Sequence, residues 1–129
     1  MLKNIMFVTV CVTDQDRALE FYTEGLGLEK QIDYPGAEGR FLTVGVPGGP
    51  VQIILWSHEP DPRVEAWQLA APGPLVLESD DLRKDFEVMR GRGVTFDRSE
   101  PEDYPFGVRI AAVDPDGNRI SLREPRRAR

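Results

Sequence analysis

Apolar runs alternate along the chain with short polar segments rich in glycine and proline, and this pattern predicts a mixed α and β fold. Residues 5–12 form a run of β-branched and apolar side chains that predicts a strand covered on both faces. Thr13 and Asp14 can accept hydrogen bonds from free backbone N–H groups, so they predict a helix start. The apolar face of that helix carries Ala18, Leu19, Tyr22 and Leu26. Three strands follow, at 28–34, 40–46 and 51–56.

The same order recurs in the second half of the chain. A strand is predicted at 75–77, followed by a helix capped by Ser79 and Asp80. Further strands are predicted at 94–97, 107–113 and 119–123, with a tight turn at 114–118. The buried face of the second helix is predicted to carry Leu82, Phe86 and Met89. Because Phe7 corresponds to Pro74 and Gly27 to Gly93, the chain is a βαβββ repeat.

A chain of 129 residues is long enough to bury one core, so we expect a single domain. Its first module spans 1–56 and its second spans 74–124. Prolines interrupt residues 57–73, which predicts a connector without long regular elements. A tail follows at 125–129.

In their order and spacing, several short motifs resemble the vicinal oxygen chelate superfamily, which includes glyoxalase I, bleomycin resistance proteins and extradiol dioxygenases. The carriers are the segments 12–14, 18–22, 25–28, 79–82, 93–94 and 114–118. The resemblance implies an α+β fold in which two βαβββ modules form a curved mixed sheet around a cleft. It also implies a homodimer.

Enzymes of this superfamily hold a divalent metal with two side chains from each module. The resemblance places those positions on Phe7, Gln52, Pro74 and Ser121. Phe7 and Pro74 have no donor atom, and a neutral hydroxyl and an amide are weak ligands without stronger ones. We therefore predict a protein without a metal and without a cofactor.

Without a metal, the predicted cleft is an apolar cavity with a few polar points, which is typical of small-molecule sites. The competing interpretation is that these side chains only fill the core. The predicted ligand-binding residues are Phe7, Thr9, Gln52, Ile54, Trp56, Val76, Tyr104, Phe106, Arg109 and Ser121, with Pro74 beside them.

Four other side chains have two interpretations each. Arg109 is a candidate anchor for an anion or carbonyl, or it has a structural role and pairs with a nearby carboxylate such as Asp114 or Asp116. Arg40 is a weaker candidate of the same kind. Cys11 either lines the cleft or is a buried apolar residue, and His58 is predicted to be a solvated imidazole in the connector.

Charge and hydropathy exclude other classes of partner. The net charge is −6, and the only basic run, Arg123 to Arg129, is predicted to be a solvated terminus, so nucleic acid binding is not expected. No stretch approaches the roughly 20 apolar residues that cross a bilayer, and no signal peptide is recognised. With one cysteine, the chain is expected in the cytoplasm.

These observations favour a metal-independent protein that binds and sequesters a small aromatic or amphipathic compound. The alternative is a lyase, isomerase or dioxygenase-like enzyme acting on a small carbonyl or thiol-containing substrate. A scaffold without a small ligand is a third possibility. The sequence favours binding over catalysis and names no catalytic residue.

Overall fold

The computed structural model describes residues 1–36, 39–57 and 75–126. The chain forms two compact units, Met1–Arg63 and Val64–Arg129. Of the sequence predictions, those on His58, Pro74, most of the connector and the last three residues of the tail lie outside the described residues.

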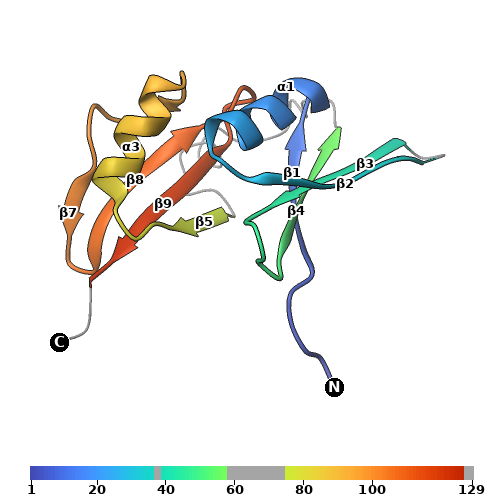
Figure 1. Cartoon of the computed structure of the whole chain (residues 1–129), viewed down its shortest axis with the longest axis horizontal. Helices are drawn as coiled ribbons and strands as arrows, with labels where there is room; N and C mark the ends of the chain where they lie inside the picture. Colours follow the sequence, from blue (N-terminus) through green and yellow to red (C-terminus); the bar gives the residue numbers. More distant parts are fainter. Residues whose placement is uncertain (37–38, 58–74, 127–129) are drawn as a thin grey trace, which may run out of the picture. The chain divides into compact units, whose positions relative to one another are not determined.

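The first unit is a mixed sheet with one helical segment (Figure 1). Where the structure describes it, this sheet has four strands in the order β1-β4-β3-β2. The β1–β4 pair is parallel, whereas the β4–β3 and β3–β2 pairs are antiparallel. Its elements are β1 (Phe7–Val12), α1 (Gln15–Glu20), the π-helical η1 (Phe21–Gly25), β2 (Glu29–Gly36), β3 (Gly39–Gly45) and β4 (Gln52–Ser57). The predicted βαβββ order is confirmed.

The β1 strand buries only one of its faces. Val10 and Val12 are buried, but Thr9 and Cys11 are exposed. The prediction of a strand covered on both faces is therefore wrong for this strand, as is that of a buried cysteine. Neighbouring side chains of a strand point to opposite faces, and only one face of β1 meets the core. Because the residues on both faces are mostly apolar, the sequence does not distinguish the buried face from the exposed one.

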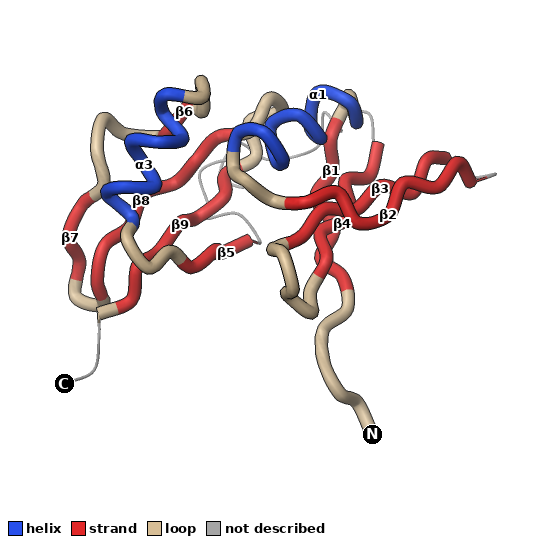
Figure 2. Tube along the Cα trace, viewed as in Figure 1, coloured by secondary structure: helices blue, strands red, loops and turns tan. Residues whose placement is uncertain are grey.

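The second unit repeats this topology and adds a short strand (Figure 2). Its described sheet has the order β5-β9-β8-β6, with β7 paired to β8. The β5 and β9 strands are parallel, as β1 and β4 are in the first unit. Its elements are β5 (Leu75–Glu78), α3 (Leu82–Gly91), β6 (Thr95–Phe96), β7 (Glu102–Tyr104), β8 (Gly107–Val113) and β9 (Arg119–Pro125).

Both described α-helices start at an aspartate. The Asp14 side chain accepts from the Arg17 N–H, as predicted. In the second unit the cap is Asp81 rather than Ser79 or Asp80. The Ser79 hydroxyl instead accepts from the N–H of Asp81, so it shapes the turn that leads into the helix.

The core of the second unit forms under α3. Leu82, Phe86 and Met89 are buried, which confirms the predicted face. The ring of Phe86 meets that of Phe96 on β6 edge to face, with centroids 4.7 Å apart. No helix within the described ranges is long and apolar enough to span a membrane.

Candidate functional site

The predicted binding residues of the first unit lie on one face of its sheet. In the parallel β1–β4 pair they occupy directly neighbouring positions, and their alternation puts them opposite the buried core residues. We call this surface the first open face. Its neighbouring pairs are Phe7 with Gln52, Thr9 with Ile54, and Cys11 with Trp56. Most of these side chains are half-buried, so the surface is partly apolar.

Gln52 is held in place by a buried threonine on β3. The Thr43 hydroxyl donates to Gln52 Oε1 at 2.6 Å and accepts from the Ile32 N–H at 3.0 Å. This second bond lies at an irregularity between Lys30 and Ile32, where the β2–β3 register shifts. One side chain thus closes the bulge and fixes the Gln52 amide.

A cavity opens where β3 and β4 stop pairing. Their ladder ends at Thr43 and Ile54. The described residues that line the cavity are Gly39, Arg40, Trp56 and Ser57, and its volume is about 240 Å³. Such a volume suits a small ring system better than a large drug, since typical ligand pockets begin near ~300 Å³.

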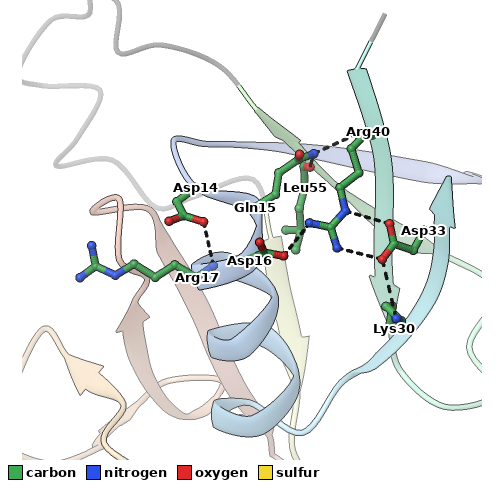
Figure 3. Close-up of polar contacts among 8 residues, drawn as sticks. All are labelled: Asp14, Gln15, Asp16, Arg17, Lys30, Asp33, Arg40 and Leu55. Carbon is green, nitrogen blue, oxygen red and sulfur yellow. Dashed lines mark hydrogen bonds and ion pairs between the residues drawn. The ribbon is translucent and has the colours of Figure 1, made fainter. Parts of the chain in front are cut away.

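Gln15 bridges the two strands beside this cavity. Its Nε2 donates to the carbonyl oxygens of Arg40 on β3 and Leu55 on β4, both at 2.9 Å (Figure 3). The amide therefore hydrogen-bonds two backbone carbonyl oxygens in the region where β3 and β4 no longer pair with each other. The helix start is tied to both cavity walls.

Arg40 is an ion-paired structural side chain. Its guanidinium donates to both carboxylate oxygens of Asp33 at 2.8 Å and to Asp16 at 2.7 Å (Figure 3). These bonds lower the pKa of Asp33 below its usual range, mainly through the hydrogen bond from Arg40, and raise the pKa of Arg40. Two carboxylates neutralise this arginine, so its candidacy as an anion anchor is not supported.

The predicted residues of the second unit gather on the face of β9 and β8 that is opposite to α3. Val76 on β5 lies beside Ser121 on β9, and Arg109 and Tyr104 follow on β8 and β7. We call this surface the second open face. Ser121 is 7% exposed, whereas Val76 is 59% exposed. Phe106, in the turn between β7 and β8, is 73% exposed and contacts the Tyr104 ring edge to face.

Arg109 pairs with Glu102, not with Asp114 or Asp116. Its Nε donates to the Glu102 carboxylate at 2.8 Å, and Glu102 also forms an ion pair with Arg98. The Arg109 hydrogen bond is the main cause that lowers the pKa of Glu102. Pairing with a nearby carboxylate is confirmed, but the carboxylate is not one of the two suggested aspartates, because β7, which carries Glu102, has no apolar alternation that would predict a strand.

Arg123 belongs to this surface, and the sequence analysis missed it. The sequence places it both at the end of the predicted strand 119–123 and in the basic run expected to be solvated, and the structure shows that it lies in β9 and is half-buried. Its Nε donates to Ser121 Oγ at 2.9 Å, and its Nη1 to the Tyr104 hydroxyl at 3.3 Å. The available signal was the strand period, because a residue two positions after Ser121 shares its face.

The positions that match the family's metal ligands carry donors that are already engaged. Gln52 Oε1 accepts from Thr43, and Ser121 Oγ accepts from a guanidinium that would repel a cation. In register, Ser121 lies beside Val76 on β5. Among the described side chains, no group of three or more His, Cys, Asp or Glu could hold a metal ion. This donor set does not fit a divalent cation.

Two βαβββ units, each with its first and last strands paired in parallel, define a class of small repeat protein. The sequence matches one family of that class. The chain belongs to the Glyoxalase/Bleomycin resistance protein/Dioxygenase superfamily, which matches residues 4–122. It is 30% identical to YetH of Bacillus subtilis over 96% of this chain and 100% of YetH. It is 32% identical to YurT of the same organism, over 92% of this chain and 97% of YurT.

Solved structures show the same fold. TnmS3, an antibiotic binding protein from Streptomyces sp. CB03234, is 31% identical with a TM-score of 0.82, over 97% of this chain and 98% of that chain. UcmS2 is 36% identical with a TM-score of 0.80, over 95% of this chain and 98% of that chain.

Proposed function

We propose that this protein binds a small, flat aromatic compound and sequesters it without a metal and without catalysing a reaction. The observation that carries this proposal is the cavity beside Trp56, together with the half-buried apolar side chains of the first open face. An indole at a cavity wall offers a flat stacking surface with little conformational freedom to lose. The likeness to an antibiotic binding protein supports an antibiotic-like ligand.

The residues on the two open faces also support binding rather than catalysis. Arg40 and Arg109 are ion-paired, and the side-chain oxygens of Gln52 and Ser121 are engaged. None of these groups is arranged as a nucleophile beside a base, which acyl or proton transfer requires. The described donors therefore orient a ligand better than they activate one.

Ligand binding is tested by thermal shift across planar aromatic compounds, thiols and divalent metals, because a ligand of the native state raises the melting temperature. Compounds that stabilise the protein are then titrated by tryptophan fluorescence. Trp56→Ala should weaken their binding by about 1–3 kcal/mol, as expected for a lost buried aromatic contact.

Val88→Ala, on the exposed side of α3, serves as the control and should bind like the native protein. The proposal is wrong if no aromatic compound stabilises the protein, or if Trp56→Ala binds every such compound unchanged.

We further propose that two copies of the chain pair in solution. The family resemblance implies a dimer, and apolar side chains before β1 are exposed, with Ile5 at 66% and Met6 at 64%. Sedimentation velocity at micromolar concentration should give a species of twice the chain mass. A single monomeric species across that range would contradict the pairing.

A further inference from the structure

Two arginines on the second open face are direct neighbours on adjacent strands, and no described carboxylate contacts both of them. Arg109 and Arg123 are direct partners in the antiparallel β8–β9 pair. Both guanidiniums lie over the Tyr104 ring, with their carbons 4.7 and 5.3 Å from its centroid. Like charges directly opposite each other on neighbouring strands destabilise a sheet, and here Glu102 offsets the charge of Arg109 but not that of Arg123.

The nearby carboxylates do not neutralise Arg123. Glu102 serves Arg109 and Arg98. Glu78 lies on the neighbouring strand β5 as the register partner of Arg123, but the two side chains form no ion pair within 4.0 Å. Glu124 is the next residue along β9, and its carboxylate accepts from the N–H of Leu82 at the start of α3.

The described contacts of Arg123 are therefore all neutral. They are the hydroxyls of Ser121 and Tyr104 and the ring of Tyr104. In the first unit, by contrast, Arg40 contacts two carboxylates. A guanidinium has five N–H donors in a flat fork. Arg123 uses two of them in its bonds to the two hydroxyls, so the remaining donors can bind a carboxylate.

Aromatic surface adjoins this charge. Tyr104 lies beneath the guanidinium, and the exposed ring of Phe106 has its centroid 5.8 Å from that of Tyr104. A ligand that satisfies both features is a planar aromatic ring bearing an acidic group. Arginine side chains stack on such rings while they bond to the acid.

We propose that Arg123 anchors the acidic group of a planar aromatic compound bound on the second open face, with Tyr104 holding the guanidinium in place. This inference rests on the proposed function and specifies the ligand class as aromatic carboxylic acids. The overall charge of −6 repels anions, so any preference for the acid has to arise at a local cationic group.

The test compares two ligands that differ only in charge, 1-naphthoate and 1-naphthamide, by calorimetric titration of the full chain. The native protein should bind the acid about tenfold more tightly than the amide, because a charge-assisted bond replaces a neutral one. Arg123→Gln should remove this preference and leave amide binding within about twofold.

Two further variants guard against a loss of folding. Arg123→Lys keeps the charge but loses the fork, so it should retain part of the preference. Arg92→Gln removes an exposed arginine at the end of α3 and should bind both compounds like the native protein. Thermal melts establish that each variant is folded.

The outcomes separate this inference from the proposed function. If the amide binds but the native protein does not prefer the acid, or if Arg123→Gln keeps the preference, the anchor is wrong and aromatic binding stands. If the native protein binds neither compound, the anchor falls together with the aromatic ligand on which it rests.

Discussion

Thr43 connects three strands of the first unit through one hydroxyl group. It is fully buried, donates to Gln52 on β4 and accepts from the backbone of Ile32 on β2. Thr43→Val keeps the shape but leaves the Ile32 N–H and the Gln52 amide oxygen without this partner. An unsatisfied buried polar group costs about 1–3 kcal/mol, and we expect the free energy of unfolding to fall by that amount.

Urea denaturation measures this change. Thr95→Val, at an exposed strand position, is the control and should shift the free energy of unfolding by less than about 0.5 kcal/mol. If both variants lose the same stability, the Thr43 hydroxyl has no special role at the bulge.

At this scale the sequence identifies which side chains share a face but not which bonds they form. Phe7, Gln52 and Trp56 share the first open face, because a strand alternates with a fixed period. Their proximity to a ligand stays a prediction. That Thr43 accepts from the Ile32 N–H depends on a register shift at the bulge, which no local pattern predicts.

Arg40 on β3 forms one ion pair with Asp33 on β2, within the hairpin, and another with Asp16 on the first helix. Because Asp33 has a lowered pKa in the folded protein, its contribution to stability is present above the pKa of an unfolded aspartate, near ~3.9. That contribution is lost as the pH falls through the lower pKa that Asp33 has in the folded protein. Acid should therefore weaken the cross-strand link between Asp33 on β2 and Arg40 on β3.

Asp33→Asn removes this link at every pH. Its melting temperature should lie below that of the native protein at pH 7, and the difference should vanish in strong acid. Thermal melts from pH 7 to pH 2 follow the effect. Asp80→Asn, at an exposed position before α3, should track the native curve, and a constant gap between Asp33→Asn and native protein would contradict the linkage.

Most elements of the fold could be predicted because their signals are local. Apolar runs, aspartate caps and helical spacing predict both modules, and the structure confirms their order. The β7 strand is the exception. Its three residues, Glu102 to Tyr104, carry two charges, and only pairing with β8 makes them a strand. For the same reason the sequence predicts a carboxylate partner for Arg109 but does not identify it as Glu102.

Across the whole molecule, the two units share a connectivity and differ in how their arginines are neutralised. Neither unit presents donors suited to a divalent cation at the described family positions. We expect elemental analysis of dialysed protein to find no stoichiometric transition metal. Zinc, nickel and manganese should leave the melting temperature unchanged, whereas one metal per chain after dialysis would show that the ligand positions are misassigned.

The bonds of Gln15 to both strands beside the cavity bear on how fast a ligand can enter. Because its amide holds the diverging strands at a fixed separation, no paired strand has to open before a ring slides in beside Trp56. If the proposed aromatic ligand binds there, the conformation seen is the competent one, and we expect no loss of affinity to a rare open state. The capture rate should then be set by encounter, and selectivity between compounds should lie in how long each one stays.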